Sequence, residues 1–226
     1  MTKNIIITID GPAGSGKSTS AKLVAEKLGY TYLDTGAMYR AITYLALKNN
    51  VLNDKAEIIK IADKARITFE NSDGSQRVFV NDEEVTGQIR TFEVNSNVSE
   101  VSVIPEVRES LVRMQRQIGR EIDVVAEGRD TGTVVFPDAD VKFFLVASIR
   151  ERAQRRMKEF EAKGQHKSLG EIQDNIMHRD MIDSGREVSP LRKAEDAIEI
   201  DTSDITIEEQ VSAIIRKVEE KLKGKF

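Results

Sequence analysis

The chain has 226 residues, of which 39% are hydrophobic and 32% charged, so a folded core is expected and a wholly disordered chain is excluded. Its 34 basic and 38 acidic side chains leave a net charge of −4, which argues against nucleic acid as the main partner. Cysteine is absent and only two histidines are present, which excludes disulfides, thiolate metal sites and cysteine nucleophiles and disfavours a multi-histidine centre. No apolar run approaches the roughly 20 residues of a membrane span. The N-terminus has no signal-peptide layout, so we expect a cytoplasmic protein without membrane contact.

The chain opens on the pattern of a strand, a loop and a helix. Residues 5–9 form a short β-branched apolar run, which is typical of a strand buried in a parallel sheet. The glycine-rich segment 10–16 interrupts this run, and residues 17–28 then carry apolar side chains at helical spacing. We expect a brief strand ending at residue 33 and a helix over about 36–48.

Residues 67–90 have a different pattern, that of antiparallel strands. Two β-rich runs, 67–69 and 78–80, flank the turn-rich segment 71–75, which predicts a hairpin. A third strand could begin at Val85. This segment therefore indicates a small β-rich insert in a larger α/β domain.

The rest of the chain alternates between helical and strand patterns. Helices are expected over about 93–103, 105–119, 148–163, 168–184 and 207–222, and strands over 122–126, 141–147 and 197–200. Together with the two strands near the N-terminus, these make five short strands between helices. The sequence thus predicts one α/β domain over 1–226, built on a doubly wound parallel sheet.

Residues 11–18 match the phosphate-loop pattern of Gly, four residues and Gly-Lys-Ser, between a predicted strand and a predicted helix. Backbone amides at the helix start favour an anion, Lys17 would reach the β- and γ-phosphates, and the Ser18 hydroxyl would face Mg²⁺. A ligand-free turn is the alternative, but the helix dipole disfavours Lys17 there by up to about 1 kcal/mol, which indicates a function. The residues expected to bind ATP are Gly11, Pro12, Ala13, Gly14, Ser15, Gly16, Lys17, Ser18 and Thr19.

Two further segments follow predicted strands, where open α/β sheets place ligands. Residues 34–40 end in Arg40, and residues 127–132 contain Arg129 beside a glycine. A single arginine of this kind is more often a surface ion pair, but two favour recognition of a second phosphate. The Asn-Lys-x-Asp segment of guanine-specific switches is absent. A kinase that holds two phosphorylated molecules is therefore expected.

At this point the chain resembles the bacterial cytidylate kinase family along its whole length, including the β-rich insert. The segments that carry the resemblance are the phosphate loop, residues 33–40, residues 128–137, and Arg179, Asp180, Asp183 and Arg186. The last set, taken alone, would also fit a solvated salt-bridge ladder on a helix. The resemblance implies a P-loop fold with a monophosphate-binding insert at about 67–90 and a helical lid at about 150–186.

The resemblance also implies the reaction, its cofactor and its site. ATP would phosphorylate CMP and dCMP to CDP and dCDP with Mg²⁺, and Lys17, Arg129 and Arg186 would be catalytic. The expected CMP-binding residues are Arg40, Arg129 and Arg186 at the phosphate, Arg179 and Asp183 at the ribose, Ser99, Arg108 and Asp130 at the base, and Thr35.

Base recognition is chemically coherent in this scheme. Asp130 would accept from the exocyclic amine of cytosine and Arg108 would donate to N3 or O2, whereas uracil would set a carbonyl against the carboxylate.

Glu127 departs from the family, many members of which have Asp there, and this leaves its part in the Mg²⁺ shell open. The lid arginines Arg150, Arg152, Arg155 and Arg156 are typical of a solvated face, although one or two would contact phosphate.

Two alternatives stay open from the sequence. The first is a P-loop nucleotide sensor that binds ATP without transferring phosphate. The second is a kinase for UMP, AMP or another small anion. In each case the partners are small molecules, and a monomer is expected.

Overall fold

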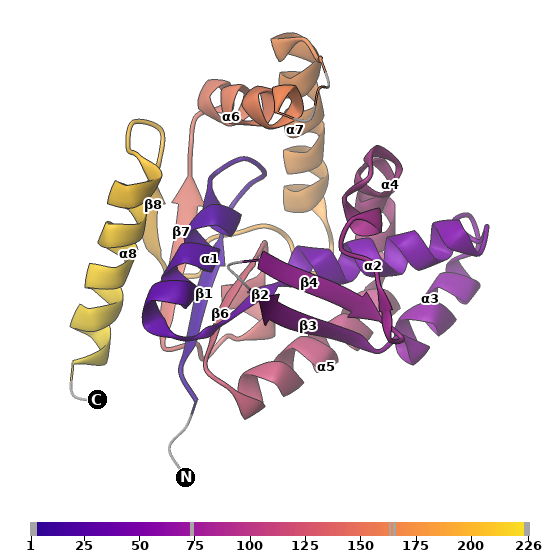
Figure 1. Cartoon of the computed structure of the whole chain (residues 1–226), viewed down its shortest axis with the longest axis horizontal. Helices are drawn as coiled ribbons and strands as arrows, with labels where there is room; N and C mark the ends of the chain where they lie inside the picture. The colour runs from indigo at the N-terminus through magenta and orange to yellow at the C-terminus, as the bar shows by residue number, and fades with distance from the viewer. Residues whose placement is uncertain (1–3, 73–74, 163, 165, 224–226) are drawn as a thin grey trace.

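The computed structural model describes residues 4–72, 75–162, 164 and 166–223. At its centre is a five-stranded parallel sheet in the order β2-β6-β1-β7-β8 (Figure 1). Its strands are β1 (Ile6–Asp10), β2 (Thr31–Asp34), β6 (Val124–Gly128), β7 (Val141–Val146) and β8 (Ile198–Asp201). The prediction of a doubly wound parallel sheet is confirmed.

Helices cover both faces of this sheet, because alternate residues of its central strand β1 point to opposite sides. Ile7 and Ile9 pack with α1 (Lys17–Leu28) and α8 (Ile207–Leu222) on one face. On the other face, α2 (Thr35–Lys48), α3 (Lys55–Lys64), α4 (Phe92–Ser102) and α5 (Pro105–Glu121) form a second apolar cluster. The five carboxyl ends of the strands therefore meet at one edge of the sheet, between two packed layers.

The expected hairpin forms a three-stranded antiparallel sheet of β3 (Ile67–Ser72), β4 (Ser75–Val80) and β5 (Glu83–Glu84). Val78 and Val80 are buried in the same apolar cluster as α2 and α3. This small sheet therefore shares its core with one face of the main sheet. The turn predicted at 71–75 includes residues 73–74, which lie outside the described part of the chain.

Two helices, α6 (Ile149–Glu161) and α7 (Leu169–Gly185), form a pair above the carboxyl edge of the sheet (Figure 1). Ala153 from α6 and Ile172 and Ile176 from α7 are buried against each other in a small separate cluster. A capping box of Ser168 and Glu171 begins α7. The pair is thus held together by its own small apolar core.

Several predicted bounds need correction. The third strand of the insert comes before Val85 and not at it, and β6 begins two residues later than expected. Helix α3 and the π-helical turn η2 (Thr131–Val135) were not predicted. Residue 163, the expected end of one helix, lies outside the described residues. Among those described, no helix has the length and apolar character to cross a membrane.

Candidate active site

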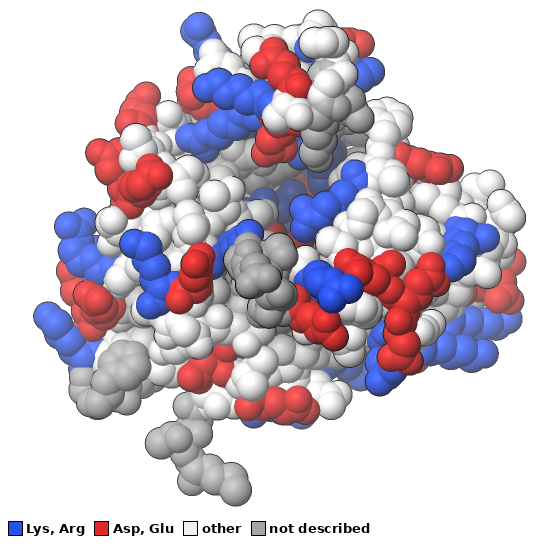
Figure 2. Space-filling model, in the orientation of Figure 1, with Lys and Arg blue, Asp and Glu red and all other residues white. Residues whose placement is uncertain are grey.

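A cavity of about 400 Å³ lies at the carboxyl edge of the sheet, between the α6–α7 pair and the sheet with its covering helices. Figure 2 shows it as a hollow in which basic side chains gather. Open α/β sheets bind ligands at this edge. All nine residues expected to bind CMP line this one cavity: Thr35, Arg40, Ser99, Arg108, Arg129, Asp130, Arg179, Asp183 and Arg186.

The phosphate loop forms one end of the cavity. Residue 11 must be a glycine, because a Cβ on Gly11 would come 2.2 Å from the Leu145 carbonyl oxygen. Gly16, with φ of 85°, turns the chain into α1, and no side chain caps that helix, so amides of its first turn can face an anion. Of the nine expected ATP-binding residues, Ala13, Gly14, Gly16, Lys17, Ser18 and Thr19 line the cavity, whereas Gly11, Pro12 and Ser15 do not.

Lys17 begins α1 and is only 6% exposed. Its Nζ donates to the Pro12 carbonyl oxygen at 3.1 Å. Burial, aided by the charges of Arg129 and Arg179, lowers the pKa of Lys17 to about 7. An anion bound beside it would favour the charged form again.

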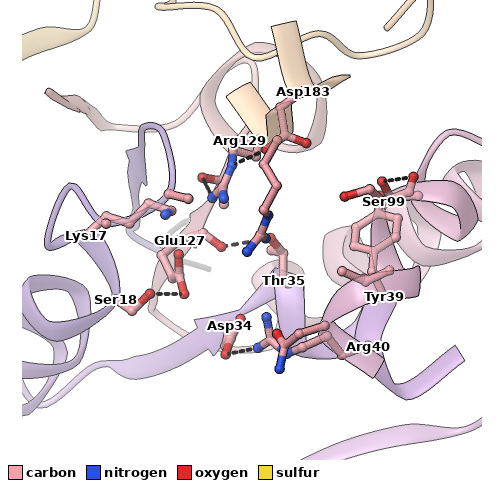
Figure 3. Close-up of a pocket in the computed structure, with 18 of the residues that line it drawn as sticks. Lys17, Ser18, Asp34, Thr35, Tyr39, Arg40, Ser99, Glu127, Arg129 and Asp183 are labelled. Atoms are coloured by element: carbon pink, nitrogen blue, oxygen red, sulfur yellow. Dashed lines mark hydrogen bonds and ion pairs between the residues drawn. The ribbon is translucent and has the colours of Figure 1, made fainter. Parts of the chain in front are cut away.

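Ser18, the residue after Lys17, is hydrogen-bonded to the buried carboxylate of Glu127. Ser18 Oγ donates to Glu127 Oε1 at 2.8 Å, and the Tyr32 hydroxyl donates to the same oxygen at 3.2 Å. Burial and the nearby charge of Asp34 raise the pKa of Glu127. Figure 3 shows Ser18, Glu127 and Asp34 on the same side of the cavity. Oxygen donors of this kind suit Mg²⁺, which takes one or two protein ligands and completes its shell with phosphates and water.

An arginine cluster forms the middle of the cavity. Arg129 Nε donates to Asp183 Oδ2 at 2.8 Å, and Arg186 lies 3.8 Å from the same carboxylate. Burial favours the neutral form of Asp183, but these two arginines outweigh it and lower the pKa of Asp183. Burial, together with Arg129, lowers the pKa of Arg179 to about 10. Asp183 is shared by all three guanidinium groups, and the lowered pKa of Arg179 indicates an excess of positive charge that an anionic ligand would relieve.

Arg40 lies at the edge of this cluster and has a different partner. It donates to Asp34 Oδ2 at 2.8 Å (Figure 3). Asp34 Oδ1 caps α2 by accepting from the Ala37 amide. Arg40 Nε has no hydrogen-bond partner although it is buried. This free donor supports the expectation that Arg40 faces a further ligand.

The far end of the cavity is a buried ion pair of Arg108 and Asp130, which are 2% and 5% exposed. Arg108 also donates to the Ser102 carbonyl oxygen at 3.1 Å and lies 5.1 Å from the centre of the Tyr39 ring. Ser99 lines the same end. A planar ring, a carboxylate and a guanidinium together form a pocket suited to a flat polar heterocycle.

The α6 arginines contact the phosphate loop itself. Arg152 Nη1 donates to the Ala13 carbonyl oxygen at 3.2 Å and to Asp180 Oδ2 at 2.6 Å. Arg155 Nη1 donates to Thr202 Oγ1 at 3.0 Å. Arg155 and Arg156 line the cavity, whereas Arg150 is exposed. The solvated-face interpretation therefore fails for Arg152, which is buried.

Sequence reasoning missed three groups that shape the site. Asp34 holds Arg40, Tyr39 lies under Arg108, and Asp10 supports the turn after β6. Asp34 gave a signal, because Asp before a helix is a common N-cap. Asp10 and Tyr39 gave none, since each acts on a residue far away in the sequence.

A phosphate loop that faces an arginine cluster across one cavity defines a P-loop kinase of small phosphorylated molecules. The chain belongs to the cytidylate kinase family, whose model, described as cytidylate kinase, matches residues 7–220. It is 49% identical over 219 residues to the cytidylate kinase of Lactobacillus johnsonii, covering 96% of this chain and 95% of that protein. It is 53% identical over 217 residues to the cytidylate kinase of Streptococcus sanguinis, with 95% and 96% covered.

Among solved structures, an uncharacterized protein from Eubacterium ventriosum is similar with a TM-score of 0.54 and 13% identity. The match covers 96% of this chain and 99% of that protein. At this low identity the likeness shows the fold alone.

Proposed function

We propose that this protein transfers the γ-phosphate of ATP to CMP and dCMP, producing ADP with CDP or dCDP. The observation that carries the proposal is the order of groups along one cavity: Lys17 of the phosphate loop, Arg129 of the arginine cluster, then Tyr39 beside the Arg108–Asp130 pair (Figure 3). An oxygen of the CMP phosphate would attack the γ-phosphorus in line while the bond to the ADP oxygen breaks. The loose transition state of this reaction needs positioning and charge neutralisation more than a strong base.

The phosphate loop would hold the ATP phosphates, with Lys17 reaching the β- and γ-phosphates. Ser18, close to Glu127, would hold Mg²⁺, whose charge would help neutralise the phosphate oxygens when it is bound. Among the described residues no cluster of three or more acidic or histidine side chains could hold a metal alone. This agrees with an ion that arrives with the nucleotide.

The arginine cluster would hold the CMP side. Arg40, Arg129 and Arg186 would bind the phosphate, and Arg179 and Asp183 the ribose hydroxyls. Arg129 and Arg186, like Lys17, would act in the transfer by neutralising charge on the moving phosphoryl group. Thr35, whose hydroxyl donates to the Glu127 carbonyl oxygen at 2.7 Å, would line the floor of this site.

The Arg108–Asp130 pair, with Ser99, would read the base. Arg108 and Asp130 bond each other in this structure, and CMP would exchange that bond for bonds to its own ring. Cytosine offers both a donor and an acceptor for this exchange, whereas uracil has a carbonyl in place of the amine.

The pair α6–α7, within the lid at about 150–186, lines the cavity and would close over it to exclude water during transfer, whereas no described residue of the insert at about 67–90 lines it. The proposed substrates are small molecules, and we propose that the protein acts on them as a monomer. Because ATP and CMP are intracellular metabolites, we place the activity in the cytoplasm.

A coupled ADP-release assay with Mg²⁺, ATP and one acceptor at a time tests the proposal. We expect turnover with CMP and dCMP, confirmed by CDP and dCDP as products, and far slower turnover with UMP, AMP or no acceptor. ATP binding without CDP would favour a nucleotide sensor. Faster use of UMP or AMP than of CMP would assign the second site to another monophosphate.

A further inference from the structure

Asp10, the last residue of β1, is a buried carboxylate that points away from the adjacent phosphate loop. It is 4% exposed and does not line the cavity. Its oxygens accept three hydrogen bonds from the turn after β6: Oδ1 from the Thr131 amide at 2.9 Å and hydroxyl at 2.7 Å, and Oδ2 from the Gly132 amide at 2.7 Å. A residue next to the ATP loop in sequence is thus bonded to the other half of the site.

These bonds replace a missing helix cap. Asp130 stands at the N-cap of the turn Thr131–Val135, but its side chain makes no capping bond, because it is paired with Arg108. The first amides of the turn would be unsatisfied in a buried place, which is costly. Asp10 accepts from two of them across the sheet, and this leaves Asp130 free to face the cavity.

The turn is also packed tightly against β1. A Cβ on Gly132 would lie 2.8 Å from Thr8 Oγ1, and Thr131 is completely buried. Burial raises the pKa of Asp10 to about 6, against the lowering effect of the Gly132 and Thr131 bonds. At neutral pH the group is still ionised and therefore only an acceptor, the state that three donors require.

We propose that Asp10 is a positioning residue for the acceptor nucleotide: by fixing the turn at Thr131 and Gly132, it sets the directions of Arg129 and Asp130. The inference rests on the proposed function, in which those two residues bind the CMP phosphate and base. It contrasts with the interpretation from sequence position, in which Asp10 would support the ATP loop that begins at Gly11. The two interpretations predict losses for different substrates.

The test is the split of KM between the two substrates in Asp10→Asn. The amide replaces one acceptor oxygen with a donor that faces a backbone N–H, so the turn loses a bond and gains a repulsion. We expect KM for CMP to rise at least tenfold and the preference for CMP over UMP to fall, with KM for ATP within about twofold of the original. Thr131→Val, which removes only the hydroxyl donor, should shift the same values less.

Asp123→Asn is a matched control, because Asp123 Oδ1 accepts from the Ile5 amide at 2.6 Å near the opposite end of β1. It should leave both KM values unchanged even if it lowers the melting temperature. If Asp10→Asn does not fold, Thr131→Val carries the test alone. Equal increases in both KM values, or a larger one for ATP, would overturn the inference.

Failure of the proposed function would be recognised separately. The unmodified protein is assayed first with each monophosphate, and its best acceptor is then used for the KM comparison. If that acceptor is not CMP, the proposed function fails while the split in KM still tests Asp10.

Discussion

Several charged side chains in this cavity have pKa values shifted by burial and by neighbouring charges, and Lys17 is the clearest case. Its pKa is lowered to about 7 by burial first and by Arg129 and Arg179 next, with Glu127 opposing them. The ordinary lysine pKa lies far above neutrality, at about 10.4. A bound anion would offset the arginine charges that disfavour the charged form of Lys17.

Because ATP phosphates beside Lys17 would raise its pKa again, we predict that ATP binding takes up protons near neutral pH. Uptake by Lys17 should be about half a proton at pH 7, approach one near pH 8, and vanish near pH 6 where the free lysine is already charged. Calorimetry in buffers of different ionisation enthalpy measures it. Lys17→Met should abolish this part of the uptake and lower kcat by at least about 10²-fold while the protein stays folded. Equal uptake in the variant would contradict the assignment.

Asp130 determines a different property, the choice of base. Asp130→Asn would present an amide donor to O4 of uracil while losing an acceptor for the cytosine amine. We therefore expect the ratio of kcat/KM for CMP to that for UMP to fall by roughly 10²-fold, measured by the coupled assay. Asp63→Asn is a fitting control, because Asp63 pairs with Arg113 at 3.2 Å outside the cavity and should leave the ratio unchanged. An unchanged ratio in Asp130→Asn would remove that residue from base recognition.

At the scale of elements, the α6–α7 pair is joined to the phosphate loop through Arg152. This side chain bonds the Ala13 and Ala147 carbonyl oxygens and also Asp180 of α7. Three separate elements thus meet at one guanidinium. The position of the pair above the cavity and the shape of the loop are consequently coupled.

We predict that Arg152→Met raises KM for ATP about tenfold and changes KM for CMP little, because the loop loses its outer support. A double-mutant cycle with Asp180→Asn should give a coupling of roughly 0.5–3 kcal/mol in ATP binding, measured by calorimetry. Arg150→Met on the same helix is the control, since Arg150 is exposed. A coupling of zero would mean that the two side chains act independently.

Most of the fold could be predicted from local patterns. Strands with continuous apolar runs and helices with clear caps or spacing were found, because their signals lie within a few residues. Helix α3 was missed although Asp54 caps it, and the turn η2 is invisible locally. The conformation of η2 depends on Asp10, more than 100 residues away, and no local pattern encodes such a contact.

The candidate site was predictable only in part, for the same reason. The phosphate loop is a contiguous motif, and the arginines of the second site follow strand ends or share a helix. That Arg152 would be buried against the loop depends on how α6 packs, which the spacing of its charges does not indicate. That Asp34 would hold Arg40 depends on a contact between residues six apart, more than one helical turn, which the sequence permits without requiring.

The molecule as a whole has a net negative charge, whereas the lining of its cavity has more basic than acidic side chains. The chain carries −4 overall. The residues that line the cavity include eight basic and only five acidic side chains, and Figure 2 shows the basic ones around the hollow. An approaching nucleotide therefore meets repulsion from the distant surface and attraction from the cavity.

These two effects predict opposite responses to salt, so the response identifies which one governs binding. At about 0.1 M salt the Debye length is about 10 Å, which screens the distant surface but only part of the contact with the arginine cluster. We expect cavity attraction to dominate, so that raising KCl from about 20 to about 200 mM lowers kcat/KM for CMP roughly two- to fivefold. Cytidine, which lacks the phosphate, is the matched ligand, and its inhibition constant should not change. A rise of kcat/KM with salt would mean that the net negative charge controls the encounter.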